Sequence, residues 1–276
     1  MCIRDRTYTL KRNKSGQAMS VSLNFVRHGE AGRPIIILHG LFGSARNWQG
    51  IAKQLAEHDT VYSLDLRNHG SSPHADEMGY ESMAADVLAF MTLEDIKEAV
   101  VLGHSMGGKV AMQLALSEPE KVSQLIVVDM APVTYSHNFD DVLLGLYHVP
   151  LDSVGSRKEA DQYLAEKLST PSLRQFLLQN LVANTSGGYQ WRVNLASIEK
   201  SMPDIMGFPA NSLKKQYANR ALFINGGQST YMTSRYREPT KEMFPAAEFQ
   251  TIAKSGHWPH IESPVEFMTL LNSFLS

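Results

Sequence analysis

Gly103-His104-Ser105-Met106-Gly107 follows directly on the apolar run Val100-Val101-Leu102, and this stretch decides the fold. The glycines let the chain turn sharply from a strand into a helix, which lifts the serine hydroxyl above the sheet edge. The pentapeptide alone recurs by chance, but here a strand precedes it and an apolar helical segment follows it. This context favours a nucleophile at Ser105 over a merely structural turn.

Short apolar runs alternate with helix-sized segments on both sides of this motif. Runs rich in Val, Ile and Leu are typical of strands in a parallel sheet that is covered on both faces. We therefore predict an α/β fold, with a mostly parallel central sheet, helices on both faces, and ligand chemistry at the carboxyl ends of the strands. The expected strands are Ile35–Leu38, Val61–Leu66, Val100–Leu102, Leu125–Val128, Leu222–Ile224 and Glu248–Ala253, and the expected helices are Trp48–Glu57, Tyr80–Leu93, Gly107–Ser117 and Val265–Phe274.

The alternation breaks between residues 134 and 213, where the apolar spacing is helical and no strand-like run occurs. A segment of this length is too long for a loop and predicts a helical cap, or lid. It is inserted after Leu125–Val128, which is the sixth strand in the usual count for enzymes with this serine motif. Residues 19–133 and 214–276 then form the core. Residues 1–18 lack apolar periodicity, and we expect them to be a disordered N-terminal extension.

Composition excludes several classes of protein. The 276 residues carry a net charge of −2, which gives no electrostatic attraction to nucleic acid or to anionic lipid. No apolar stretch approaches the ~18 residues of a membrane span, and the N-terminus lacks the apolar region of a signal peptide. The single Cys2 forms no internal disulfide. We expect a cytoplasmic protein, monomer or homodimer, with a small-molecule substrate and no nucleic-acid or membrane partner.

A serine hydroxyl needs a base within hydrogen-bond reach and an acid that orients the base, in the chain order Ser, acid, His. Four histidines follow Ser105: His137, His148, His257 and His260. His257 comes just after the expected last strand, Glu248–Ala253, so a strand-end loop can carry it to the serine. We predict that His257 is the base and interpret His260 as a supporting or surface residue.

The acid is the more informative case. In many enzymes of this kind it follows the seventh strand, here Leu222–Ile224, yet the next residues contain no carboxylate before Glu238. An aspartate does stand at the end of the preceding strand, Asp129, 129 − 105 = 24 residues after the nucleophile. A carboxylate there can accept from the histidine without leaving the active edge. We predict Asp129 as the acid; the alternative is an aspartate that only caps a loop.

An oxyanion hole requires two preorganised N–H donors. One is expected from the residue after the nucleophile, Met106, and the other from the loop that follows Ile36-Ile37-Leu38. In that loop Leu41 is the preferred donor and Phe42 the second choice. Losing one such donor typically raises the transition-state barrier by about 3 kcal/mol.

Further side chains are candidates for substrate contact. His104 and Trp258 are adjacent to Ser105 and His257, and Phe42 lies in the loop expected to supply an oxyanion donor. His104 also fits a packing role behind the turn. Four cap residues are candidates for contact with the acyl chain, with the core of the cap as their alternative role: Tyr163, Phe176, Trp191 and Met206. Arg67-Asn68-His69-Gly70 either lines the active edge or binds its own backbone.

These features together resemble the α/β-hydrolase superfamily. The segments HGLFGSARNW, DLRNHGSSP, GHSMGGKVAM, VVDMAPV, FLLQNL, WRVNL and GHWPHIESP are similar to those of the small bacterial carboxylesterase group typified by esterase YbfF. The resemblance implies hydrolysis of short acyl esters, with acyl thioesters as a further class, through an acyl-enzyme intermediate. It also implies an acid after the sixth strand and no cofactor or metal, and no His, Cys, Asp and Glu cluster has metal-ligand spacing.

Other functions stay open at this point. Carbon–carbon bond hydrolases and cofactor-free perhydrolases share a Ser-Asp-His set, whereas dehalogenases and epoxide hydrolases of the superfamily are disfavoured because they use aspartate as the nucleophile. A binding module on a hydrolase scaffold is a remote alternative, because a fold alone does not prove activity. Val26-Arg27-His28-Gly29-Glu30 matches the RHG signature of histidine phosphatases, but a polar hairpin turn after an alternating strand, Val21–Phe25, explains it better.

Overall fold

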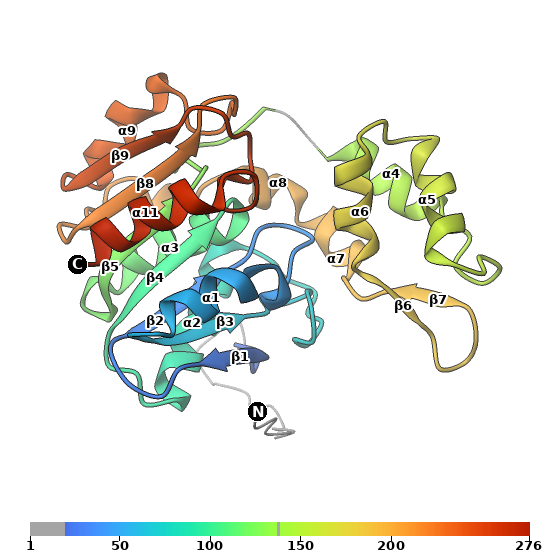
Figure 1. The fold of residues 1–276 in the computed structure, drawn as a ribbon, viewed down its shortest axis with the longest axis horizontal. Helices are drawn as coiled ribbons and strands as arrows, with labels where there is room; N and C mark the ends of the chain where they lie inside the picture. The colour runs from blue at the N-terminus through green and yellow to red at the C-terminus, as the bar shows by residue number, and fades with distance from the viewer. Residues whose placement is uncertain (1–19, 137–138) are drawn as a thin grey trace.

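A seven-stranded sheet forms the centre of the molecule in this computed structural model, which describes residues 20–136 and 139–276. The predicted extension 1–18, with Cys2, and His137 lie outside the described residues. The segment between the fifth and the eighth strand projects as a second lobe beside the sheet (Figure 1).

The sheet has the order β1-β3-β2-β4-β5-β8-β9. Only β1 is antiparallel to its neighbour, and all the other pairs are parallel. Parallel strands end at the same edge, so the loops after β2, β3, β4, β5, β8 and β9 meet there. The strands are β1 (Phe25–His28), β2 (Pro34–Leu38), β3 (Thr60–Leu64), β4 (Ala99–His104), β5 (Val122–Val128), β8 (Ala221–Gly226) and β9 (Ala247–Ile252).

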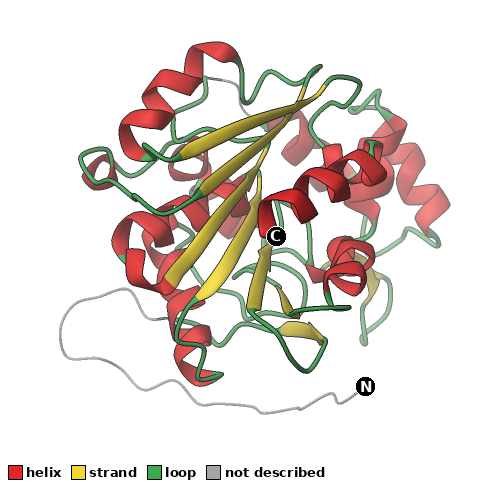
Figure 2. Ribbon diagram, turned by 60° about the vertical axis from the view of Figure 1, so that its left-hand side comes forward, coloured by secondary structure: helices red, strands yellow, loops and turns green. Residues whose placement is uncertain are grey.

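Helices cover both faces of the twisted sheet (Figure 2). Along each buried strand alternate side chains enter different cores: Ile35 and Ile37 belong to one cluster of buried residues, and Ile36 and Leu38 to the other. The core helices are α1 (Gln49–Leu55), α2 (Tyr80–Leu93), α3 (Met106–Ser117), α9 (Arg237–Met243), α10 (Pro259–Glu262) and α11 (Pro264–Leu275). Helices α1 and α11 cover one face, and α2 and α3 the other.

The predicted α/β class is confirmed, and the element boundaries differ in small ways. The strand expected over Val61–Leu66 ends at Leu64, because Asp65 turns away to accept the N–H groups of Ala45 and Ser71 at 2.7 and 2.8 Å. The alternating run Val21–Phe25 is in strand conformation only from Phe25 onward.

The polar segment that contains Arg27 and His28 is not a hairpin turn, as the sequence suggested. Both residues belong to β1, which pairs with β3 rather than with the following strand, β2. The chain passes from β1 to β2 through a short turn in which Gly29 and Gly32 adopt φ values of 78° and 84°.

The cap contains strands as well as helices. Its helices are α4 (Asp140–His148), α5 (Arg157–Ala165), α6 (Pro171–Leu178), α7 (Leu195–Lys200) and α8 (Met202–Met206). Between α6 and α7 the strands β6 (Leu181–Ala183) and β7 (Tyr189–Trp191) pair as an antiparallel hairpin, which the helical reading of this segment missed. Strands of three residues are too short to display a period of two against the helical spacing around them.

No helix in the described part of the chain is both long and apolar enough to cross a lipid bilayer.

Candidate active site

Ser105 stands in a strained turn between β4 and α3. Its φ of 52° and ψ of −119° are rare for a residue with a side chain. Two glycines permit the turn: a Cβ on Gly103 would lie 2.1 Å from the carbonyl oxygen of Gly107, and a Cβ on Gly107 would lie 2.3 Å from that of Leu38. Strain of this kind persists only where the surrounding structure holds it, and it is concentrated at functional sites.

His257 reaches Ser105 from the loop after β9. Its Nε2 lies 3.0 Å from Ser105 Oγ, and its Nδ1 lies 2.7 Å from Asp129 Oδ2. The structure therefore brings the three residues that the sequence singled out into one chain of hydrogen bonds. Their catalytic roles remain predictions.

Asp129 is fully buried and ends β5 with a φ of 51°. Its carboxylate accepts the backbone N–H of Gly226 at 3.2 Å and the hydroxyl of Ser229 at 2.5 Å. Strands β5 and β8 are neighbours, so the last residue of β8, Gly226, and the loop after it supply the donors to Asp129. The contact from Ser229 was not predicted from the sequence, although a hydroxyl in the usual place of the acid is a signal for it.

Two further contacts hold His257 in place, one to its ring and one to its backbone carbonyl. Tyr231 stacks on it with ring centroids 4.1 Å apart and an angle of 24°. His104 Nε2–H donates to the backbone carbonyl of His257 at 2.8 Å, and burial holds the pKa of His104 well below its ordinary value. A neutral His104 places no second positive charge beside His257 when His257 takes a proton. Tyr231 was not predicted from the sequence.

The loop after β2 carries a candidate oxyanion donor, the N–H of Leu41, which lines the same pockets as Ser105. The carbonyl of Gly40 accepts His39 Nδ1–H at 2.8 Å and the N–H of Gly43 at 2.9 Å. The peptide bonds of the described chain are trans, so the N–H of Leu41 points opposite to that pinned carbonyl. Within the described ranges neither the N–H of Leu41 nor that of Met106 has a protein acceptor, which leaves both available for an oxyanion.

Phe42, the second-choice donor, is engaged elsewhere. Its N–H donates to His69 Nε2 at 3.1 Å, and its carbonyl accepts Asn180 Nδ2–H at 2.8 Å. His69 belongs to the core and Asn180 to the cap, so both lobes hold Phe42, whose φ is 62°. This arrangement favours Leu41 as the donor.

Removing the amide of Asn180 should impair turnover more than binding. We expect Asn180→Ala to lower kcat for ester hydrolysis by about 10-fold, the equivalent of one buried hydrogen bond, with KM nearly unchanged. The matched control is Gln179→Ala, because exposed Gln179 also crosses from cap to core, accepting Asn47 Nδ2–H at 2.8 Å, without touching Phe42. Equal losses in the two variants would contradict a role in holding the oxyanion loop.

Two buried histidines join the loops after β2 and β3. His39 Nε2 accepts the N–H of Leu66 at 3.0 Å, and His69 Nε2 accepts the N–H of Phe42. The Nδ1–H of His69 donates to the carbonyl of Arg67 at 2.9 Å and holds the ring in place. Burial lowers the pKa of both rings, and that of His69 to about 3. In each ring Nε2 must be unprotonated to accept a backbone N–H, so protonation of the ring breaks the hydrogen bond between the two loops.

Stability should therefore fall as the solution becomes acidic. The folded pKa of His69, about 3, lies below the unfolded value of 6.5, so its stabilisation is complete above pH 6.5 and is lost as the pH falls toward 3. Between pH 7 and pH 5 this single group should lower the free energy of unfolding by about 2 kcal/mol. Urea titrations of His69→Gln should give a correspondingly smaller decrease, whereas the exposed-residue control His58→Gln should follow wild type. A His69→Gln curve parallel to that of wild type would refute this linkage.

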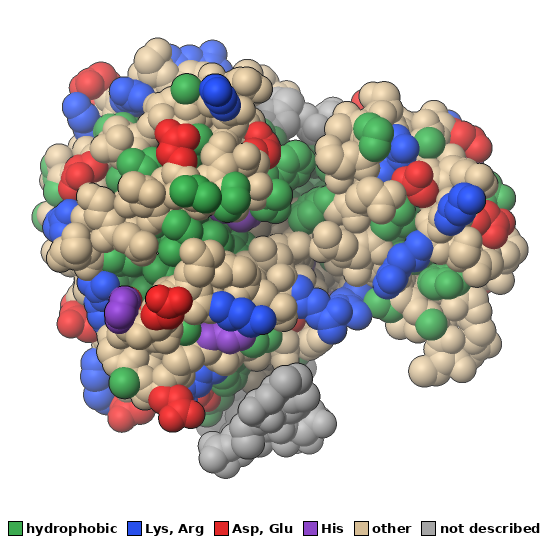
Figure 3. Space-filling view, viewed as in Figure 1, with side chains coloured by type: hydrophobic (Ala, Val, Ile, Leu, Met, Phe, Trp, Pro, Cys, Tyr) green, Lys and Arg blue, Asp and Glu red, His purple; other side chains and the backbone are tan. Residues whose placement is uncertain are grey.

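Two pockets meet at Ser105. The larger has a volume of about 240 Å³ and opens between the lobes, where Figure 3 shows apolar side chains along a hollow. The smaller has a volume of about 20 Å³. Leu41, Ser105, Phe139 and Tyr231 line both pockets and so stand between them.

The predicted substrate contacts are partly brought to these pockets. Phe42, His104, Phe176 and Trp258 line the larger pocket, and Met206 lines the smaller one. Tyr163 and Trp191 line neither pocket, so the prediction that they contact the substrate is not supported by the structure. The ring of Tyr163 packs against His148 on the cap, with centroids 6.0 Å apart, and Trp191 Nε1–H donates to the carbonyl of Leu146 at 3.0 Å inside the cap.

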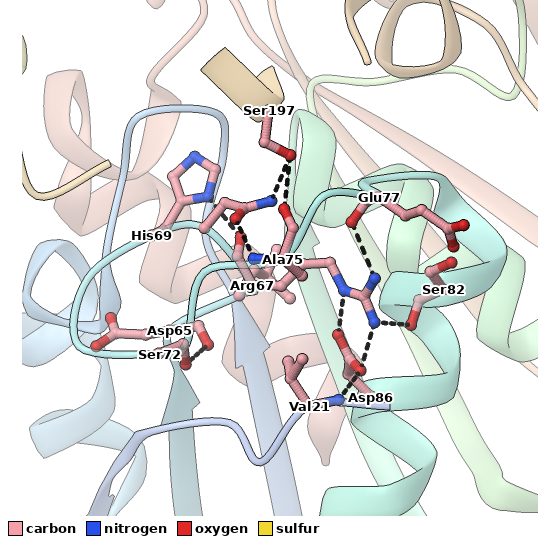
Figure 4. A network of polar contacts seen from close by, with 12 residues as sticks. Val21, Asp65, Arg67, His69, Ser72, Ala75, Glu77, Ser82, Asp86 and Ser197 are labelled. Carbon is pink, nitrogen blue, oxygen red and sulfur yellow. Dashed lines mark hydrogen bonds and ion pairs between the residues drawn. The ribbon is translucent and has the colours of Figure 1, made fainter. Parts of the chain in front are cut away.

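The segment Arg67-Asn68-His69-Gly70 is mainly structural (Figure 4). The buried guanidinium of Arg67 binds both carboxylate oxygens of Asp86, a residue of α2, at 2.6 and 2.8 Å. Asn68 fastens the core to the cap, because its Nδ2–H donates to Ser197 Oγ at 3.2 Å. Of these four residues, His69 contacts the site, because its Nε2 accepts the N–H of Phe42, which lines the larger pocket.

The remaining candidates take no part in the hydrogen-bonded path from Ser105 through His257 to Asp129. His148 pairs with Glu166 on the surface of the cap at 2.8 Å. His260 stacks on Trp48 at 4.1 Å, and burial lowers its pKa to about 3. No group of three or more His, Cys, Asp or Glu side chains suited to a metal ion occurs among the residues that the structure describes.

Comparisons with known proteins find relatives that match most of the chain. A family model described as alpha/beta hydrolase fold matches residues 33–264. The sn-1-specific diacylglycerol lipase ABHD11 of Mus musculus is 36% identical over 275 residues, covering 96% of this chain and 88% of that protein. Esterase YbfF of Escherichia coli (strain K12) is 32% identical over 247 residues, covering 88% of this chain and 93% of that protein. Among solved structures, a marine microorganism esterase superposes with a TM-score of 0.89 at 38% identity, covering 92% of this chain and all of that one.

Proposed function

Since the chain belongs to the α/β-hydrolase family, we propose that it is an esterase that hydrolyses short acyl esters through an acyl-enzyme intermediate on Ser105. The observation that carries the proposal is the continuous path of hydrogen bonds from Ser105 Oγ through His257 to the buried carboxylate of Asp129. A serine held in this way is activated for attack on a carbonyl carbon.

The proposed reaction assigns one role to each group. His257 Nε2 takes the proton of Ser105 as the hydroxyl oxygen attacks the ester carbonyl. The N–H groups of Leu41 and Met106 bind the oxyanion, and the carboxylate of Asp129 stabilises the imidazolium. His257 then gives its proton to the departing alcohol, and a water molecule activated by the same histidine releases the acid.

The names of the relatives support the ester as the substrate class. One is a diacylglycerol lipase, another an esterase, and the solved structure at 38% identity is also an esterase. Each of these names describes cleavage of an oxygen ester. Acyl thioesters require the same groups, so a thioester matched to the best oxyester measures how far the activity extends to them.

Labelling with a fluorophosphonate tests the proposal directly, because this probe forms a stable bond only with an activated serine. Mass spectrometry should place a single adduct on the peptide that contains Ser105, and labelled protein should lose hydrolysis of p-nitrophenyl acetate in proportion to the adduct. An unlabelled protein, or an adduct elsewhere with activity retained, would refute the proposal. Full labelling without hydrolysis of any ester would favour a carbon–carbon bond hydrolase.

A further inference from the structure

The two pockets at Ser105 differ in volume by about a factor of ten, at about 240 and 20 Å³. We propose that the small pocket receives the acyl group and the large pocket the alcohol, so that the substrates are acetyl or similarly short acyl esters of larger, apolar alcohols. This inference rests on the proposed function and adds the orientation of the substrate and the class of alcohol.

The position of the base assigns the alcohol to the large pocket. In acylation the bond from Ser105 Oγ to the acyl carbon forms, the bond from that carbon to the alcohol oxygen breaks, and the serine proton passes through His257 Nε2 to that oxygen. The alcohol oxygen must therefore lie beside His257 as it departs. His257, Trp258 and His260 line the large pocket, whereas none of the three lines the small one.

The oxyanion donors assign the acyl group to the small pocket. The acyl carbon is bonded to Ser105 Oγ while its oxygen faces the N–H groups of Leu41 and Met106. With the alcohol on the side of His257, the remaining substituent of that carbon extends away from the base. The small pocket lies there, and Ser105, Leu41 and Met106 all contribute to its wall.

Volume limits the length of the acyl group. A cavity needs about 10–15 Å³ on this measure to hold one water molecule. The small pocket, at about 20 Å³, therefore accepts a group of methyl or ethyl size. Each additional methylene group must displace a wall residue.

The wall of the small pocket includes a polar group, Lys109. Lys109 is 1% exposed, and its Nζ donates to the backbone carbonyls of Met206, at 3.0 Å, and Gly207, at 2.5 Å. The rings of Tyr135 and Tyr80 lie 4.8 and 5.5 Å from the ammonium group. Burial lowers the pKa of Lys109 to about 7. A long alkyl chain would have to break these hydrogen bonds or pack against the polar Nζ, which is unfavourable.

The alcohol side is apolar and open. The rings of Phe176, from the cap, and Trp258, from the core, lie 6.0 Å apart, and both line the large pocket. Ile261, which also lines it, is 55% exposed. The burial of an apolar alcohol in this pocket is favourable, and each methylene group adds to the gain.

Two ester series on the purified wild-type protein test the orientation. With p-nitrophenol as the constant alcohol, kcat/KM should fall by about 10-fold or more between acetate and hexanoate, since the longer chain exceeds the pocket. With acetate as the constant acyl group, kcat/KM should rise by about 10-fold between methyl and 2-phenylethyl alcohol. The reverse order in both series would overturn the assignment while leaving a serine esterase in place; no Ser105-dependent hydrolysis of any ester would overturn the proposed function itself.

Two cap variants separate the pockets. Met206→Ala enlarges the small pocket and should raise the hexanoate-to-acetate ratio by about 10-fold. Met202→Ala is the matched control, because Met202 lies on the same helix, α8, without lining either pocket, and the ratio should stay at the wild-type value. Phe176→Ala should alter the alcohol series alone. A change of acyl preference in Phe176→Ala, with none in Met206→Ala, would overturn the proposal, and the wild-type series decides it if a variant does not fold.

Discussion

Ser105→Ala should lower kcat/KM for p-nitrophenyl acetate by about 10⁵-fold or more while leaving the protein folded. Without the hydroxyl no acyl-enzyme forms, and His257 has no proton to remove from the nucleophile. The oxyanion donors remain, so residual hydrolysis above the rate in water is expected. The backbone strain at Ser105 is the same for alanine, so the free energy of unfolding should change by less than about 1 kcal/mol.

A suitable control removes an equally buried hydroxyl elsewhere. Ser63 in β3 is 1% exposed, and its hydroxyl has no hydrogen-bond partner within the described residues. Ser63→Ala should hydrolyse the ester at the wild-type rate. If Ser105→Ala kept more than about a tenth of the wild-type kcat/KM, a nucleophile at this position would be untenable.

Asp129→Asn should lower kcat by about 10⁴-fold, because it changes which nitrogen of His257 carries the proton. The carboxylate accepts from Nδ1–H and leaves Nε2 bare to take the proton of Ser105. An asparagine amide can instead donate to Nδ1, which places the hydrogen on Nε2 and removes the base. Steady-state kinetics at saturating substrate measure the loss, and urea titration of the same sample verifies that the variant is folded.

Glu238 is the next carboxylate after β8, and Glu238→Gln is the matched control for this test. Its side chain is 82% exposed and lies 3.7 Å from Lys241 on the surface of α9, so the control should keep wild-type kcat. A comparable loss in the two variants, or none in Asp129→Asn, would mean that the acid is misassigned.

The strand and turn that carry Ser105 could be predicted because their signals are local. Val100 to Leu102 is a continuous apolar run, and the glycines beside the serine are required within the same turn. Asp129 was accessible by a longer argument, because parallel strands end at one edge and the loop after the neighbouring strand has no acid. Residues like Ser105 and Asp129 can therefore be predicted from their sequence neighbours and from the expected order of the strands.

The lining of the pockets could not be predicted in the same way. Helical spacing in the cap identifies a buried face but not whether that face meets the core or another cap element. Phe176 reaches the large pocket, whereas Trp191 and Tyr163 pack within or on the cap. The bonds from His69 and Asn180 to Phe42 also join residues 27 and 138 positions apart, and no local pattern records them.

Asp129, the proposed acid, lies at the end of β5 and precedes the cap in the chain, whereas His257 follows the cap. Ser105 and Asp129 are therefore inherited together on one short stretch of gene. Recombination between related genes, with a crossover anywhere inside the cap, would exchange the loop of His257 and part of the pocket lining but would leave the proposed nucleophile with its proposed acid. New specificities can thus be assembled from parental halves without separating the pair of residues whose spacing along the chain is shortest.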